Sequence, residues 1–358
     1  MQTQNYKTDF TGKNIFVGID SHLKSWTVSI MLDDLMLKRF SQNPSPELLA
    51  EYLHHNYPGA TYYSAYEASY CGFWIHKKLT SLGISNIVVN PADVPTTDKE
   101  RKQKEDRRDS RKIARSLQKK ELEGIYIPSD ENIEDRALMR LREKITVDLT
   151  RDKNRTKSAL YLRGIEIPEE FCKSGHWSKR FIKWIEELKF INNSGNHVRD
   201  TLLHQIKNHR ESLLILTRQI KELSTTEMYK ANFEVLKSVP GVGLITAMVL
   251  LTELDQISRF VNFDHLCSYV GISPSTDSTG DKEKVKGLTP RHNNLLRKTI
   301  IESTWTAIRI DPALSLAYSN YRQKMNEQKA IVKVAKKLLS RIYFVLRTKA
   351  KYVPCVVK

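Results

Sequence analysis

The first ninety residues alternate short apolar runs with amphipathic ones, and this order limits the chain to an α/β arrangement. Short runs rich in β-branched and aromatic residues predict strands at 15–19, 26–32, 35–40, 61–66 and 86–89. Two longer segments with apolar residues on one side predict helices at 46–57 and 73–82. The predicted order is therefore β-β-β-α-β-α-β, in which the first two strands form a hairpin.

Two acidic residues lie where predicted strands end. Asp20 follows the strand 15–19, and Glu67 follows the strand 61–66. An Asp alone at a strand end is usually a turn or cap residue, but α/β folds also place their chemistry at strand ends. Two such acids in one predicted sheet are candidates for a shared site.

A third acidic feature is the run 104–117, which lacks Gly and Pro and predicts a helix. Asp106 and Asp109 are three residues apart, so they share one helical face. Carboxylates held together repel each other, and a divalent cation relieves that repulsion. A solvated face with ion pairs is the alternative, since most mixed-charge runs are of that kind. Spacing alone also allows Glu105, which is four residues before Asp109, as a ligand.

Charge and cysteine usage narrow the class of partner. The chain has 358 residues, a length typical of two or three domains, and a formal net charge of +17. Such an excess favours a nucleic-acid partner. No apolar run approaches the ~20 residues of a membrane-spanning helix, and residues 1–10 lack a signal-peptide core. We therefore expect a cytoplasmic protein that binds nucleic acid and has no membrane partner. The scattered cysteines predict reduced thiols and no zinc site: Cys71, Cys172, Cys267 and Cys355.

The middle of the chain is predicted to be helical. Residues 134–162 form a charged helix whose basic side chains either lie along phosphates or form a solvated face. In 197–223 apolar residues recur at three- and four-residue steps, which predicts a long helix of the coiled-coil type. His209 and Arg210 interrupt that pattern.

A Pro-Gly-Val-Gly turn opens the last third of the chain, at residues 240–243, between two predicted helices. It resembles the turn of helix-hairpin-helix DNA-binding motifs, in which glycines let the backbone approach a phosphate at a helix N-terminus. Gly241 and Gly243 are therefore predicted nucleic-acid-binding residues. A plain tight turn between helices is the alternative. Residues 295–346 are predicted to be helical.

The acidic motifs together resemble a known family. Gly18-Ile19-Asp20, Tyr66-Glu67-Ala68-Ser69 and Asp106-Arg107-Arg108-Asp109 resemble the four-acid (DEDD) signature of RuvC-like, ribonuclease-H-type domains in insertion-sequence transposases. The resemblance implies that Asp20, Glu67, Asp106 and Asp109 are catalytic residues that bind Mg²⁺. Its register selects Asp106 over Glu105. The family is described as bridge-RNA-guided recombinases and is related to the Piv invertase.

A second block resembles the family's C-terminal transposase domain. It combines Gly271-Ile272-Ser273-Pro274, Ser278-Thr279-Gly280, a basic loop and the helix start Leu296-Arg297. In the family the catalytic serine directly precedes the glycine; here that position is Thr279, after Ser278. The nucleophile is thus Ser278 or Thr279, or the copy is impaired. Without the resemblance, 274–280 would be read as a polar loop. The predicted nucleic-acid-binding cations are Lys282, Lys284, Lys286, Arg291 and Arg297.

The resulting prediction is an α/β plus α protein with three parts. These are a RuvC-like DEDD domain (12–130), a helical linker with a coiled-coil arm (131–228) and a mostly helical transposase domain with a helix-hairpin-helix-like motif (229–350). The predicted function is DNA cutting and rejoining that moves an insertion sequence. The resemblance implies DNA, a structured guide RNA and a homodimer or homotetramer as partners. The alternatives are a metal-dependent junction nuclease that uses water and a catalytically inactive nucleic-acid-binding protein.

Overall fold

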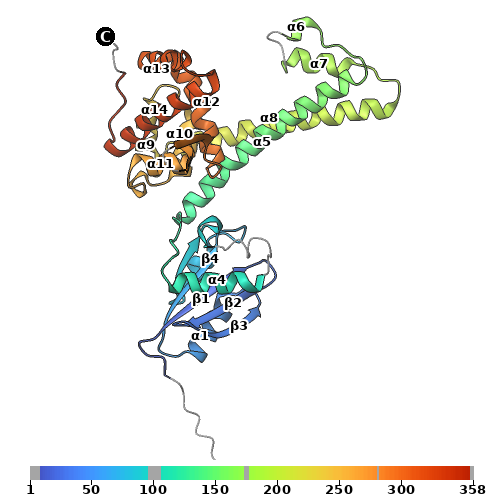
Figure 1. Cartoon of the computed structure of the whole chain (residues 1–358). Coiled ribbons are helices and arrows are strands. Elements are labelled where there is room, and N and C mark those ends of the chain that lie inside the picture. The colour runs from blue at the N-terminus through green and yellow to red at the C-terminus, as the bar shows by residue number, and fades with distance from the viewer. Residues whose placement is uncertain (1–8, 96–105, 173–176, 280–281, 355–358) are drawn as a thin grey trace, which may run out of the picture. The chain divides into compact units, whose positions relative to one another are not determined.

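The computed structural model divides the chain into two compact units, residues 1–127 and 128–358 (Figure 1). It describes residues 9–95, 106–172, 177–279 and 282–354, with only the backbone of 106–108 and 274–286. The second unit contains both the predicted arm and the C-terminal helices. Met139 and Ile220 of the arm belong to the same core as those helices. The three-part division at 130 and 228 stays a prediction.

A five-stranded mixed sheet forms the centre of the first unit. Its order is β3-β2-β1-β4-β5, in which β2 is antiparallel to β1 and β3, and β4 is parallel to β1 and β5. The strands are β1 Asn14–Ser21, β2 Trp26–Leu32, β3 Leu35–Gln42, β4 Thr61–Glu67 and β5 Ser85–Val89. All five predicted strands are confirmed, with ends that differ by one or two residues.

Helices cover both faces of this sheet. The helices α1 (Pro46–Asn56) and α2 (Trp74–Ser81) pack on one face, and α4 (Asp106–Gln118) packs on the other. The short 3-10 helix η1 (Pro91–Asp93) follows β5. Side chains alternate along β1, so Ile19 faces the α1–α2 side while Gly18 faces α4. The α/β layers predicted for the N-terminal part are thus present.

Gly18 is the point of closest approach between the sheet and α4. A Cβ atom at this position would lie 2.0 Å from the backbone oxygen of Ser110 and 2.4 Å from the backbone nitrogen of Ala114. Beside it, the hydroxyls of Ser29 and Ser110 are hydrogen-bonded at 2.9 Å. Only glycine at position 18 permits α4 to pack this closely on β1.

Two long helices form an arm in the second unit. The helix α5 (Asp130–Tyr161) runs beside α8 (Asn193–Leu223), and α6 (Glu169–Cys172) and α7 (Lys179–Glu187) lie near one end of the pair (Figure 1). Both long helices were predicted, and the apolar face of α8 finds its partner in the same chain. A small core of α5, α7 and α8 residues, including Leu160, Phe181 and Ile206, closes that end.

A buried polar contact explains the interrupted apolar pattern in α8. Asp152 of α5 is 2% exposed, and its carboxylate lies 3.0 Å from His209 Nδ1 and 2.8 Å from Arg155 Nη1. A polar layer of this kind replaces an apolar one in the arm. Such layers can fix the register of paired helices at a cost in stability.

The rest of the second unit is mostly helical. Its helices are α9 Glu227–Lys237, α10 Leu244–Leu254, α11 Phe263–Val270, α12 Asn294–Ile310, α13 Pro312–Arg322 and α14 Glu327–Thr348, with the 3-10 helix η2 Ile257–Arg259. Every residue of α10 from Ala247 to Leu254 is buried, so this helix is the centre of the core. The predicted helical C-terminal part is confirmed.

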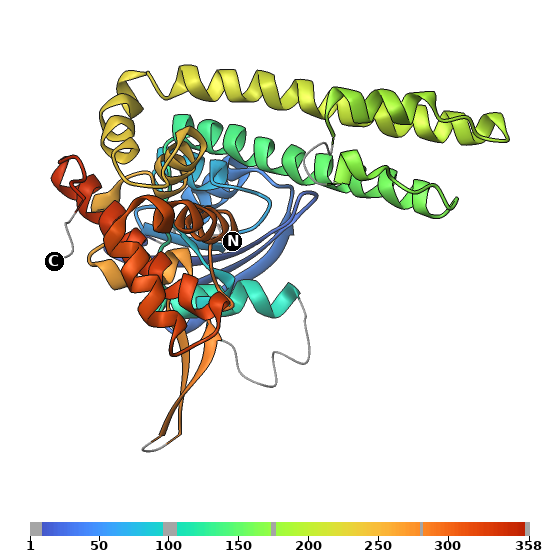
Figure 2. The same ribbon diagram turned by 90° about the horizontal axis from the view of Figure 1, so that it is seen from above.

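The prediction of a loop at 274–280 is wrong for 274–279. Pro274–Thr279 forms β6, which pairs antiparallel with β7 (Lys282–Leu288). Figure 2 shows the two strands extending from the helices of this part. The segment is polar and contains Pro, which suggests a turn, but strand formation depends on pairing with a partner further along the chain.

A buried ion pair joins the base of the arm to α10. Glu253 is fully buried and accepts two hydrogen bonds from Arg140, at 2.6 and 2.9 Å, and one from Asn293 at 2.8 Å. Hydrogen bonding to Glu253 raises the pKa of Arg140, so the guanidinium stays charged. This pair connects α5, α10 and the residue that caps α12.

Removing the arginine should therefore destabilise the second unit. We expect Arg140→Ala to lower the free energy of unfolding by about 2–3 kcal/mol, because the substitution leaves a buried carboxylate without its main partner. Arg151→Ala is the matched control, since Arg151 pairs with Asp148 on the surface of the same helix. It should cost less than about 1 kcal/mol. Denaturant unfolding measures the free energy of unfolding of both variants. Equal losses would show that the contact between Arg140 and Glu253 adds no stability.

Candidate active site and nucleic-acid surfaces

Asp20 and Glu67 lie on one face of the sheet, at the ends of adjacent parallel strands. The register of β1 and β4 pairs Gly18 with Ala65 and Ile19 with Tyr66, so the two acids follow at equivalent positions. Gly18 and Ala65 both face α4, and side chains two residues further along a strand point the same way. The structure thus brings the first two predicted acids together on the α4 side.

The helix α4 carries the other two acids and lies across this face. Asp109 is next to Ser110, whose backbone oxygen is the atom that approaches Gly18 most closely. The Asp109 side chain is about one-third exposed and lies 3.8 Å from Lys112 Nζ. Asp106 is the first residue of α4, and its side chain lies outside the described part. Asp109 is therefore on the helix that faces Asp20 and Glu67.

The donor chemistry of the acids at the strand ends suits a divalent cation. Carboxylate oxygens are the ligands that Mg²⁺ prefers, and Asp20 and Glu67 supply them on one face. Within the residues the structure describes, no group of three or more His, Cys, Asp or Glu side chains is assembled closely enough to hold an ion. Because the Asp106 side chain lies outside the described part, the convergence of all four acids stays a prediction.

Two residues that the sequence did not single out contact this site. His22 Nε2 lies 3.3 Å from Asp20 Oδ1, and His22 Nδ1 lies 3.3 Å from the hydroxyl of Tyr70. Tyr70 belongs to the loop that follows Glu67. An exposed His and an exposed Tyr separated by 48 residues have no sequence signal that links them. Only the adjacent ends of β1 and β4 bring them together.

The predicted nucleophiles lie on the β6–β7 hairpin in the second unit. Ser278 pairs with Glu283 and Thr279 with Lys282, at the end of the ladder between β6 and β7. Lys284 and Lys286 lie further along β7. The side chains of all these residues are outside the described part, so their roles stay predictions. The backbone nevertheless places both hydroxyl residues near the end of an extended hairpin.

Arg297 lies at the root of this hairpin, in the first turn of α12. Its Nη2 donates to the backbone oxygen of Thr289 at 2.6 Å. Its Nε is buried without a hydrogen-bond partner among the residues that the structure describes. Burial lowers the pKa of Arg297, which means that the charged form is poorly solvated. A cation in this state is suited to an anion such as a phosphate. Arg291, before α12, is exposed.

The two glycines of the Pro-Gly-Val-Gly turn have different surroundings. Gly241 has a φ of +81°, and a Cβ there would lie 2.4 Å from the backbone oxygen of Ser303 in α12. Gly243 precedes α10 and has no atom within 4 Å of the equivalent position. Gly241 is therefore required for the turn and for helix packing. Gly243 has the open space that a phosphate would need, while phosphate binding at either glycine stays a prediction.

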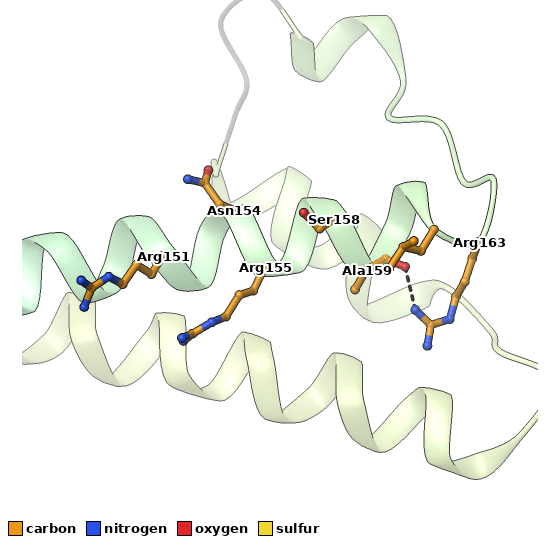
Figure 3. Close-up of a pocket in the computed structure, with 7 residues that line it drawn as sticks. Arg151, Asn154, Arg155, Ser158, Ala159 and Arg163 are labelled. Carbon is orange, nitrogen blue, oxygen red and sulfur yellow. Dashed lines mark hydrogen bonds between the residues drawn. The ribbon is translucent and has the colours of Figure 1, made fainter.

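The predicted basic helix has an open, arginine-rich surface. A shallow pocket of about 570 Å³ lies along α5 and is lined by Arg151, Asn154, Arg155, Ser158, Ala159, Leu162 and Arg163. Figure 3 shows the side chains that line it. Arg151 and Arg155 form ion pairs with acids of the same helix, and Arg163 donates to a backbone oxygen. These pairs offset part of the positive charge. Binding of phosphates along this surface stays a prediction.

Two known families match the segments that contain the four acids and the β6–β7 hairpin. Residues 17–163 match a transposase family named for its DEDD acids and for IS110, and residues 233–319 match the Transposase IS116/IS110/IS902 family. The first match contains all four acids, and the second contains the Pro-Gly-Val-Gly turn, the hairpin and Arg297. The chain belongs to the IS110 family of transposases. The family relationship predicted from the sequence motifs is confirmed.

Individual relatives in this family are moderately similar. A putative transposase, y4qE, of Sinorhizobium fredii is 28% identical over 244 residues, which cover 68% of this chain and 58% of the relative. The transposase for insertion sequence element IS1533 of Leptospira borgpetersenii is 28% identical over 248 residues, or 67% and 69%. A second Sinorhizobium fredii protein, y4rJ, is 29% identical over 307 residues, or 77% and 75%.

Among the helices in the described ranges, none is both long enough and apolar enough to cross a bilayer. The longest, α5 and α8, carry many charged residues.

Proposed function

We propose that this IS110-family chain cuts and rejoins DNA strands to move an insertion sequence. The observation that carries the proposal is the placement of Asp20 and Glu67 on adjacent parallel strands, on the face covered by the helix of Asp106 and Asp109. The mixed sheet, with its acids at strand ends, agrees with the ribonuclease-H-type fold implied by the DEDD resemblance. Two acids on one sheet face, with two more on the helix that lies across it, suit phosphodiester chemistry better than a purely structural role.

In this proposal Asp20, Glu67, Asp106 and Asp109 would hold Mg²⁺ at the scissile phosphate. A bound ion supplies charge neutralisation at the phosphate and at the leaving oxygen. The protein's contribution is to fix the carboxylates: the ladder between β1 and β4 sets Asp20 against Glu67, and the contact at Gly18 sets α4. The acids are thus positioned by rigid elements rather than by mobile loops.

The hydroxyl of Ser278 or Thr279 would attack phosphorus. A new bond forms between the side-chain oxygen and phosphorus, the bond from phosphorus to one DNA oxygen breaks, and the departing DNA hydroxyl takes up a proton. The side-chain hydroxyl needs a base, because alone it is a weak nucleophile. The half-buried cation Arg297 and the lysines of β7 are candidates to stabilise the charge that develops on the phosphate. The covalent intermediate keeps the bond energy for rejoining.

The partners follow from the same proposal. The substrates are the ends of the element and a DNA target, and the resemblance implies a structured guide RNA and a homodimer or homotetramer. The net charge of +17 is consistent with several phosphate-binding surfaces. Co-purification of a defined small RNA with the expressed protein, followed by sequencing of that RNA, tests the guide.

A protein–DNA adduct tests the hydroxyl mechanism. The full-length protein is incubated with its guide, target DNA and Mg²⁺, and denatured samples are then examined for DNA-linked protein. We expect Ser278→Ala to abolish the adduct if Ser278 attacks, and Thr279→Val to abolish it if Thr279 attacks. Strand exchange that persists in the double variant would contradict the mechanism.

The presence of threonine at position 279 favours a second candidate function. The family has serine directly before the glycine, and the β-branch of threonine crowds an attack on phosphorus. A water-using, metal-dependent junction nuclease would need the four acids and no side-chain hydroxyl. Cleavage without any adduct in the same experiment would select this function.

A further inference from the structure

The segment that follows Glu67 exposes two large aromatic rings to solvent, one in the loop and one at the start of α2. Tyr70 is 68% exposed and Trp74, the first residue of α2, is 51% exposed. Side chains of this size usually contribute to a core, so two exposed ones shortly after the candidate acid Glu67 in the chain require an explanation. Neither ring is used by the mechanism proposed above.

The backbone that carries these rings is held in place by buried contacts. Tyr66 is fully buried, and its hydroxyl donates to Gly72 O at 2.8 Å and accepts from His76 N at 3.3 Å. Burial raises the pKa of Tyr66 to about 12, so the phenol keeps its proton. Cys71 is also buried, and its Sγ lies 3.6 Å from the backbone oxygen of Ser21. The loop is therefore preorganised rather than free to collapse over the rings.

Each exposed ring has support on one side. The ring centroid of Trp74 lies 6.4 Å from that of Trp26, which is completely buried. The Tyr70 hydroxyl contacts His22, which in turn contacts the carboxylate of Asp20. A continuous row of side chains thus leads from Asp20 to the exposed ring of Tyr70.

The chemistry of the rings and of their surroundings indicates which kind of ligand binds to them. Flat aromatic surfaces bind nucleic-acid bases by stacking, and a basic protein attracts the strand that carries those bases. The row from Tyr70 to Asp20 places one ring next to the residues proposed to act on a phosphodiester. The turn between β1 and β2 adds the exposed cation Lys24. These features favour a nucleic-acid strand over an apolar protein partner.

We propose that the rings of Tyr70 and Trp74 are a stacking platform for unpaired DNA bases, with Tyr70 taking a base beside the scissile phosphate and Trp74 a base further along the strand. This inference rests on the proposed function, because it assigns the flanking nucleotides of the same acid site. The bases in a duplex are already stacked on each other, so the platform selects a locally unpaired strand. His22 is a positioning residue that holds Tyr70 beside Asp20.

The test uses the full-length protein and single-stranded oligonucleotides that contain 2-aminopurine, whose fluorescence falls when the base stacks. We expect Tyr70→Ala and Trp74→Ala each to weaken binding by about tenfold and to reduce the quenching, whereas Tyr70→Phe retains both. Tyr161→Ala is the matched control for an exposed tyrosine on the arm. Leu23→Ala controls for exposed apolar surface near the site. Both controls should change affinity less than twofold.

Further measurements separate the possible outcomes. An oligonucleotide with abasic sites should bind wild type and Tyr70→Ala equally, because it has no base to stack. If Tyr70→Ala and Trp74→Ala keep wild-type affinity and quenching, the platform is wrong. If they instead alter only the oligomeric state in sedimentation, the rings contact a second copy and the inference is also overturned. If each variant has the same thermal unfolding temperature as the wild type, a folding defect is excluded.

The same assay distinguishes this inference from the proposed function. Asp20→Asn should abolish strand cleavage but retain quenching of 2-aminopurine by the rings. If Asp20→Asn cleaves normally, the function of the acids is wrong while the stacking result stands. If cleavage is lost and quenching is also absent in wild type, the acids act without the platform.

Discussion

Asp20→Asn and Glu67→Gln are each expected to lower the rate of DNA strand cleavage by about a thousandfold or more. Both substitutions keep the size of the side chain and remove one negative charge from the face covered by α4. Loss of a charge-stabilising group of this kind costs several kcal/mol in the transition state, and each 1.36 kcal/mol is a factor of ten. Gel-based cleavage with guide, DNA and Mg²⁺ measures the effect.

Surface carboxylates of the same unit are the controls. Asp34→Asn, in the turn between β2 and β3, and Glu51→Gln, on α1, alter exposed acids. They should leave cleavage within about twofold, since exposed charges contribute little. Circular dichroism should show the same fold for all four proteins. Wild-type cleavage by Asp20→Asn would make the acid pair structural and would remove the main support for the proposed function.

Gly18→Ala is expected to destabilise the first unit and to abolish cleavage. The added methyl group would lie 2.0 Å from a backbone oxygen and 2.4 Å from a backbone nitrogen of α4, and neither can rotate away. Overpacking of this kind costs about 1–3 kcal/mol, and α4 has to shift outward to relieve it. Because Asp109 directly precedes Ser110, the shift also displaces an acid of the site.

Gly243→Ala is the matched control for this substitution. Gly243 has a φ of −94°, and the space for a Cβ is open. Because Gly243 is the N-cap of α10, alanine there should lower the free energy of unfolding by no more than about 1 kcal/mol. Urea unfolding reports the stability of each variant, and limited proteolysis reports whether α4 is released. A stable, active Gly18→Ala protein would show that the packing of α4 on β1 does not set the acid site.

Local pattern was sufficient to predict much of the fold. The strands of the first unit, the long helices α5 and α8, and the helices on either side of Gly241 all follow from periodicity within about ten residues. The position of Asp20 and Glu67 at strand ends was readable for the same reason. Family membership followed from the acids and the Ser278-Thr279-Gly280 block, because those residues are specified by chemistry rather than by packing.

Other features depend on residues that are distant in sequence. The β6–β7 hairpin was predicted as a loop because a polar segment becomes a strand only when a partner supplies its hydrogen bonds. The partner of α8 is a second helix of the same arm, and the interruption at His209 is explained by Asp152, 57 residues away (209 − 152). No short segment of the chain contains both α5 and α8, or both Asp152 and His209.

The sequence by itself therefore determined the elements, the family and the candidate acids of this protein. Tertiary structure decided which of these residues meet. The ladder of β1 and β4 brings His22 and Tyr70 within 3.3 Å, the missing Cβ of Gly18 admits α4, and the buried charge of Glu253 draws Arg140 from the arm. The physical reason is the same in each case: hydrogen bonds, close packing and charge pairing act between atoms that only the folded chain makes neighbours.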